Sequence, residues 1–201
     1  MESTPFSLTF DRTGFPLVRH RNWNFSISLF PVSKYQFERF LATVQPEGEL
    51  FTDAWYRQLL AANPRCGWHE VEGRPWQLFL SGMDLAVMNR FFQYIGPGCR
   101  LPLAEEWRQL HQCASEMTSA ADLLLAECRE APLPVAHWLR AGLFPLTDEG
   151  MLEYVEVEGG VKSIGKPFYD YHPTLWRPDS LRDIEPESPF SALAGFRLVV
   201  A

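Results

Sequence analysis

The sequence predicts a single α+β domain over residues 1–201, with short helices and strands joined by long irregular connections. Its 201 residues are 46% hydrophobic and 21% charged, which is ordinary for one folded domain. The 16 prolines and 13 glycines interrupt regular structure, whereas aromatic residues, 14% of the chain, supply large side chains for a core. Helical periodicity dominates before Pro132 and strand-like patterns follow it, with no internal repeat or linker.

The first elements expected are a strand and a helix. Residues 24–29 alternate between polar and apolar side chains, which is the period of a half-buried strand. Ser33 and Gln36 then have the spacing of a capping box that opens a helix. The apolar stripe of this helix, which ends at Pro46, is Phe37, Phe40, Leu41 and Val44.

Four further helices are expected before Pro132. The second begins at Thr52 or Asp53 and ends before Pro64, because the residue before a proline avoids the α-helical region. The third opens at Ser81 and Asp84 and stops at the Gly-Pro-Gly stretch 96–98. The remaining two cover residues 101–114, with Trp107 and Leu110 facing inward, and residues 120–129.

The C-terminal third is expected to be strand-like. Residues 151–157 and 161–164 read as a hairpin that turns at Gly159 and Gly160, and residues 196–200 read as a terminal strand. Between them, residues 167–189 are rich in proline and aromatic side chains and lack periodicity. A connection of that length in one domain is typical of a functional loop.

Charge and cysteine usage exclude several classes of protein. The formal net charge is 18 − 25 = −7, so the chain repels nucleic acids and anionic membranes, and neither is an expected partner. No signal peptide or membrane-spanning segment precedes the domain, so a cytoplasmic protein with reduced thiols is expected. The four cysteines at 66, 99, 113 and 128 include no Cys-x-x-Cys pair, which disfavours a zinc or thioredoxin-type site.

Five segments, in this order, resemble motifs of the formylglycine-generating enzyme (sulfatase-modifying factor) family across roughly residues 20–200. The stretch from Phe25 to Leu41, FSISLFPVSKYQFERFL, resembles F-x-I-x-x-x-P-V-T-N-x-x-Y-x-x-F-L. Residues 83–86, followed by Phe92, stand where the family has W-E-D-A and the tryptophan of Y-C-x-W-L. Residues 100–107, RLPLAEEW, are similar to R-L-P-T-E-A-E-W. Residues 151–154 are similar to V-W-E-W, and residues 193–199 to the closing G-F-R-L-V.

The resemblance implies a C-type-lectin-like α+β fold with a binding surface made of C-terminal loops. The family's oxidases hold copper with a cysteine pair in the C-terminal segment, whereas this chain has no cysteine from Val161 to Ala201. A calcium-binding asparagine of the family is replaced by Gly150, and a capping threonine by Leu103, which has no hydrogen-bond acceptor in its side chain. These departures imply a pseudoenzyme that retains the scaffold without the oxidase chemistry.

The best candidate for a ligand or partner site is the segment from Phe168 to Asp179. Aromatic, charged and imidazole side chains on a loop supply contact area and directional hydrogen bonds. The candidate binding residues are Tyr169, Asp170, Tyr171, His172, Trp176 and Arg177. The alternative is a proline-rich loop held in place by its own aromatic side chains.

No cofactor is expected, although calcium stays open. The weak candidates for a divalent cation are Asp148, Glu149 and Glu153, but a solvated acidic strand explains these residues better than a metal site does. Copper is not expected without the cysteine pair, nor is iron, because the five histidines are scattered. Arg197 is expected to be a structural arginine paired with Glu106 or Glu153.

These observations favour a non-catalytic binding module that presents a C-terminal loop to a protein partner or a small ligand. By analogy with related domains, the partner belongs to a larger signalling or defence assembly. One alternative is a metal-dependent oxidase or oxygenase with a relocated site. Another is a structural subunit whose apolar surface is covered by copies of itself or by a neighbour.

Overall fold

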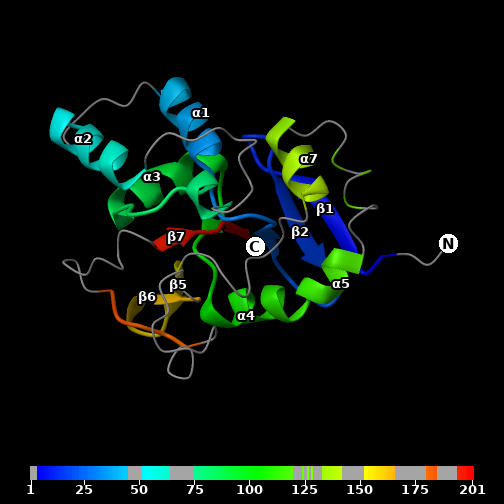
Figure 1. The fold of residues 1–201 in the computed structure, drawn as a ribbon. Helices are drawn as coiled ribbons and strands as arrows, with labels where there is room; N and C mark the ends of the chain where they lie inside the picture. Colours follow the sequence, from blue (N-terminus) through cyan, green and yellow to red (C-terminus); the bar gives the residue numbers. More distant parts are fainter. Residues whose placement is uncertain are drawn as a thin grey trace.

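The computed structural model shows a mixed α+β fold with two small β-sheets surrounded by helices, which confirms the predicted class (Figure 1). It describes residues 4–44, 51–63, 75–119, 124, 126, 128, 133–141, 152–165, 180–184 and 194–201. A five-stranded sheet has the order β1-β2-β3-β8-β4, and a three-stranded sheet has the order β6-β5-β7.

The strands are short and mostly antiparallel. The five-stranded sheet contains β1 (Phe6–Phe10), β2 (Pro16–His20), β3 (Ser26–Ser28), β4 (Cys99–Arg100) and β8 (Val199–Val200). The three-stranded sheet contains β5 (Leu152–Val157), β6 (Gly160–Ile164) and β7 (Ala194–Phe196), of which β5 and β7 run parallel. The predicted hairpin is confirmed as β5 and β6, which turn at two glycines with positive φ.

The helices are α1 (Lys34–Val44), α2 (Asp53–Ala62), α3 (Leu85–Ile95), α4 (Ala104–Gln112), α5 (Ala114–Ser119) and α7 (Leu133–Arg140), with a 3₁₀ turn, η1 (Pro75–Leu78). None of them is long and apolar enough to span a lipid bilayer, in the part of the chain that the structure describes.

The predicted capping signals are confirmed at three helices. At α1, the Ser33 N–H donates to Gln36 Oε1 over 2.9 Å and the Gln36 N–H donates to Ser33 Oγ over 3.1 Å. The side chain of Thr52 caps α2 and that of Asp84 caps α3. Helices α2 and α3 therefore begin where the sequence indicates.

Leu103 lacks a capping side chain, as predicted, and Glu106 supplies only the other half of a capping box. The Glu106 carboxylate accepts the Leu103 N–H over 2.7 Å and forms two hydrogen bonds of 2.7 Å with Arg100. The predicted helix 101–114 is wrong in its limits, because it begins at Ala104 and a break at Cys113 separates α4 from α5. The predicted helix at 120–129 lies almost entirely outside the described residues.

The β1–β2 hairpin and helix α7 are not among the predicted elements, and the prediction of one C-terminal strand over residues 196–200 is wrong. The chain instead leaves the three-stranded sheet after Phe196 and enters the five-stranded sheet at Val199. Arg197 and Leu198, between these strands, are completely buried. The single predicted strand therefore belongs to two sheets.

Arg197 connects the two sheets from this crossing point. Its Nε and Nη2 atoms donate to the Glu153 carboxylate on β5 over 2.7 and 3.1 Å. Its Nη1 atom donates to the carbonyl oxygens of Ser28 and Leu29, at the end of β3, over 3.1 and 2.7 Å. The side chains of Arg197 and Glu153 are 0% and 1% exposed, so the predicted pairing of Arg197 with Glu153 is confirmed as a buried ion pair.

A second buried polar network joins the β1–β2 turn to α1. Asp11 Oδ1 accepts the backbone N–H groups of Thr13 and Phe15 over 2.7 and 3.0 Å, as well as the Thr13 hydroxyl. Gln36 Nε2 donates to Asp11 Oδ2 over 3.0 Å, while Gln36 Oε1 accepts from Ser33. One glutamine thus completes the helix cap and holds the turn against the helix.

Replacing Arg197 by methionine is expected to lower the free energy of unfolding by about 3–5 kcal/mol, because it leaves the Glu153 charge buried without its partner. Urea denaturation measures the loss. Arg100→Met is the matched control, since the Arg100–Glu106 pair is partly exposed to solvent and its loss costs less. Equal losses in the two variants would contradict a special role for Arg197.

Burial raises the pKa of Asp11 above its ordinary value of 3.8, although hydrogen bonds from Thr13, Phe15 and Gln36 oppose the shift. The folded state therefore holds this proton more tightly than the unfolded state. Asp11 contributes most stability below pH 3.8, and that contribution falls as the pH rises through the folded pKa. A carbon-13 NMR titration of the Asp11 carboxyl group checks this, and a midpoint at or below 3.8 would refute it.

Candidate functional site

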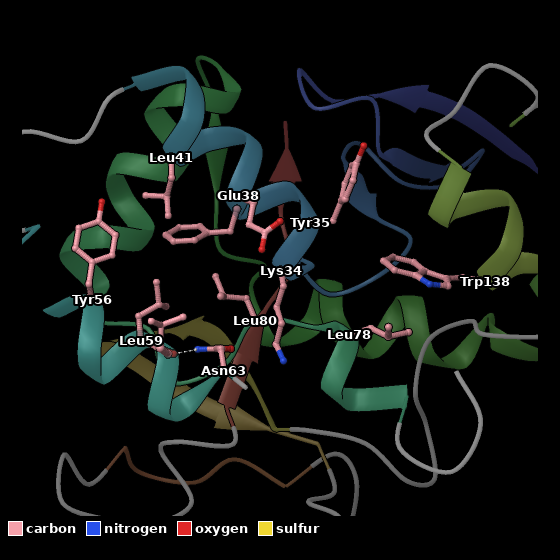
Figure 2. Close-up of a pocket in the computed structure, with 12 residues that line it drawn as sticks. Lys34, Tyr35, Glu38, Leu41, Tyr56, Leu59, Asn63, Leu78, Leu80 and Trp138 are labelled. Atoms are coloured by element: carbon pink, nitrogen blue, oxygen red, sulfur yellow. Dashed lines mark hydrogen bonds between the residues drawn. The ribbon is translucent and has the colours of Figure 1, made fainter. Parts of the chain in front are cut away.

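An apolar groove with a volume of about 560 Å³ lies between α1 and α2 and extends towards η1 and α7 (Figure 2). Its α1 wall consists of Lys34, Tyr35, Phe37, Glu38 and Leu41. Its α2 wall consists of Tyr56, Leu59, Leu60 and Asn63. Figure 2 shows Leu80 near its centre, with Leu78 and Trp138 towards the end opposite α2.

The two long walls differ in how firmly they are held. Helix α1 is anchored by Phe37 and Phe40, whose rings lie 5.8 and 5.4 Å from the ring of Phe91 on α3. Helix α2 has no fully buried residue, and its Leu60 side chain is 55% exposed. The groove therefore has one wall set in the core and one wall attached by half-buried contacts.

Asn63 attaches the C-terminal end of α2 to the chain before α3. Its Nδ2 atom donates to the carbonyl oxygens of Leu59 and Ser81 over 3.1 and 2.8 Å, and its Oδ1 atom accepts the Ser81 N–H over 2.8 Å. Both amide hydrogens are used in these bonds. Asn63 therefore shapes the groove, and the charged side chains among its lining residues are Lys34 and Glu38, one helical turn apart on α1.

A smaller cavity of about 390 Å³ lies on another face, between α1, α3 and the β1–β2 turn. Arg12 and Arg90 line it together with Tyr94, among other residues. The Arg12 guanidinium lies over the Tyr94 ring at 4.7 Å and donates to the Tyr94 carbonyl oxygen over 3.2 Å. These contacts already use part of the hydrogen-bonding capacity of Arg12. The groove between α1 and α2 is therefore a stronger candidate for a binding site than this smaller cavity.

All six residues predicted for the binding site lie outside the described part of the chain. This applies to Tyr169, Asp170, Tyr171, His172, Trp176 and Arg177, and also to the weak metal candidates Asp148 and Glu149. The prediction that Glu153, the third candidate, is a cation ligand is wrong, because its carboxylate is buried and both its oxygens bind Arg197. Within the described ranges, no group of three or more His, Cys, Asp or Glu side chains is arranged to hold a metal ion.

The described thiols are not activated. Burial, and secondly the negative charge of Asp11, raises the pKa of Cys99 to about 12. Burial, with Glu116 nearby, also raises the pKa of Cys113. Cys128 is completely buried, and Cys66 lies outside the described residues. Cys99 and Cys113 therefore behave as small apolar side chains and not as nucleophiles at neutral pH.

The sequence predicts the two helices that form the groove, but no pattern in it indicates that a space remains between them. Leu41 on α1 and Leu59 on α2 are apolar positions of predicted amphipathic helices, which normally indicate core packing. Leu60 belongs to the same apolar stripe, because Tyr56, Leu59 and Leu60 stand at positions i, i+3 and i+4, yet it is 55% exposed. Which apolar helix positions face a groove depends on the distance between the helices.

No protein-family model, curated protein or solved structure matches this chain. The resemblance to the formylglycine-generating enzyme family accordingly remains an expectation from motifs.

The raised pKa of Cys99 predicts very slow alkylation. At pH 7.5 a thiol with a pKa of about 12 carries roughly a thousandfold less thiolate than a thiol with the ordinary value of 9.0. Iodoacetamide labelling of the folded protein, read by peptide mass spectrometry, is expected to leave Cys99 unmodified while a small thiol reacts. Labelling in urea is the control, and alkylation of the folded protein at the rate of a small thiol would contradict the burial.

Proposed function

We propose that this chain is a non-catalytic binding module whose ligand site is the groove between α1 and α2. The observation that carries the proposal is the combination of volume and lining: about 560 Å³, with mainly aliphatic and aromatic walls and the charged side chains of Lys34 and Glu38. Small-molecule sites of proteins have volumes of roughly 300–1,000 Å³ and apolar linings with a few polar groups. This lining suits a ligand with an apolar body and one polar end.

The expected affinity follows from the apolar area that such a ligand buries. Burying about 200–300 Å² of its apolar surface contributes roughly 5–8 kcal/mol. Association costs of several kcal/mol oppose this gain. Binding in the upper micromolar range or weaker is therefore expected for a simple alkyl ligand, and a charged end that pairs with Lys34 or Glu38 adds to it.

The proposal includes the finer fold and the partner site expected from the sequence: a C-type-lectin-like domain of the cytoplasm that presents residues 168–179 to a protein partner in a signalling or defence assembly. Support comes from Glu153 and Arg197, which belong to two of the five resembling motifs and form the buried ion pair. In this proposal the groove takes a small ligand and the C-terminal segment contacts the partner.

The groove is tested with three eight-carbon probes, namely octylamine, octanoate and octanol, titrated into nitrogen-15-labelled protein and followed by NMR. Leu60→Glu places a charge on the exposed wall and is expected to weaken binding of the best probe about tenfold. Leu85→Glu is the matched control, because Leu85 is similarly exposed, 45% against 55% for Leu60, but lies away from the groove. If the best probe bound both variants equally, or if it caused no chemical-shift changes at Leu59 and Leu41, the groove would not be the binding site.

A second measurement separates the binding module from an oxidase or oxygenase with a relocated site. Such an enzyme contains copper or iron after purification and consumes oxygen with a thiol peptide as substrate. The binding module predicts neither, when the metal content is measured by mass spectrometry. Stoichiometric metal together with turnover would overturn the proposed function.

A further inference from the structure

Strand β1 forms one edge of the five-stranded sheet, and its pairing with β2 determines which backbone groups face outward. The Arg21 N–H donates to the Pro5 carbonyl oxygen, and the Asp11 N–H donates to the Phe15 carbonyl oxygen, each over 2.9 Å. In an antiparallel pair, hydrogen-bonded residues alternate with residues whose N–H and C=O groups point away. Residues 6, 8 and 10 of β1 therefore direct both backbone groups away from β2.

In the described part of the chain, most of these outward-pointing N–H and C=O groups form no hydrogen bond. Among the described residues, the Phe6 N–H donates to Thr4 Oγ1 over 3.3 Å, whereas no hydrogen bond involves the backbone groups of Leu8 or Phe10. Ser7 and Thr9 are exposed, and the Phe10 side chain is 43% exposed. Figure 1 shows β1 as the outermost strand on its side of the sheet, next to β2.

Strand β1 lacks three of the features that usually prevent edge pairing, namely a charge, a proline and a bulge. Its sequence, FSLTF, contains no charged residue and no proline. Its register with β2 continues from the Phe6–His20 pair to the Phe10–Pro16 pair without a bulge. Natural edge strands are normally protected from pairing by a lysine, a proline or a bulge. An edge strand without these features indicates a strand that pairs with another strand in the functional protein.

We propose that β1 pairs antiparallel with β1 of a second copy of this chain, with a two-fold axis at Leu8. The outward residues are symmetric about Leu8, so Leu8 faces Leu8 of the second copy and Phe6 faces Phe10. The Leu8 pair exchanges two backbone hydrogen bonds, as residues of this type do in any antiparallel ladder. The Phe6–Phe10 pairs do the same when the Phe6 N–H leaves Thr4 Oγ1, to which it is bonded over 3.3 Å. The strand is thus its own complement in register, and the resulting contact is isologous.

The side chains fit the same arrangement. Phe6 and Phe10 lie on one face of β1, where Phe6 is 4% exposed and Phe10 43%. The pairing brings the exposed Phe10 ring next to Phe6 of the second copy, a cross-strand aromatic pair that covers it. Because each copy carries a net charge of −7, repulsion weakens the dimer at low salt, and added salt is expected to strengthen it.

The test is sedimentation equilibrium of the whole chain from about 1 μM to 1 mM, with hydrogen exchange of individual amides by NMR at both ends of the range. The expected mass rises from 23.1 kDa towards twice that value, and the Leu8 and Phe10 amides become protected as it rises. Phe10→Pro removes an outward donor that β2 does not use, and it is expected to weaken dimerisation at least tenfold with the fold retained.

Two controls distinguish this interface from others. Phe10→Lys, which keeps the backbone donor but adds an edge charge, is expected to weaken the dimer as well, whereas Leu85→Ala removes a similarly exposed apolar side chain without effect. Leu60→Glu tests the groove and leaves dimerisation unchanged, so the two proposals fail separately. A mass of 23.1 kDa at every concentration, or a dimer unaffected by both Phe10 variants, would overturn the proposal.

Discussion

The rest of the structure depends on the buried ion pair between Arg197 and Glu153. A charge that leaves water must be compensated by hydrogen bonds, and Arg197 makes four of them, to one carboxylate and two backbone carbonyl oxygens. Those partners belong to β5 and to the end of β3, so a single side chain binds both sheets. Arg197 lies in the two-residue connection between β7 and β8, where the chain crosses from one sheet to the other.

Around this connection the aromatic side chains complete a firm framework, and α1 is part of it. Gln36 joins α1 to the β1–β2 turn through Asp11, and Phe37 and Phe40 pack against Phe91 on α3. Helix α2 is attached differently, through half-buried side chains and the hydrogen bonds of Asn63. Elements with few buried contacts open at lower free energy than the core, and binding sites commonly use them. The groove lies where a firm wall meets a looser one.

Local signals in the sequence predicted the elements well where the chemistry is local. The capping box at Ser33 and Gln36, the caps at Thr52 and Asp84, and the diglycine hairpin each involve residues within a few positions of one another. The pairing of Arg197 with Glu153 was among the expectations because the motifs that contain them recur together. The β1–β2 hairpin was missed, although the alternation of Phe6, Leu8 and Phe10 is its signal. The groove could not be predicted, because it depends on the separation of α1 and α2, which long-range packing decides.

A firm framework, connected by Arg197, thus carries the proposed binding groove, which has one looser wall. Native-state hydrogen exchange with and without octylamine, octanoate or octanol at saturating concentration tests it most directly. We expect amides of β3, β5 and β8 to exchange only by global unfolding, and amides of α2 to exchange through local opening that the bound probe suppresses. Equal protection of α2 and the strands without the probe, or no change in α2 when it is bound, would contradict the account.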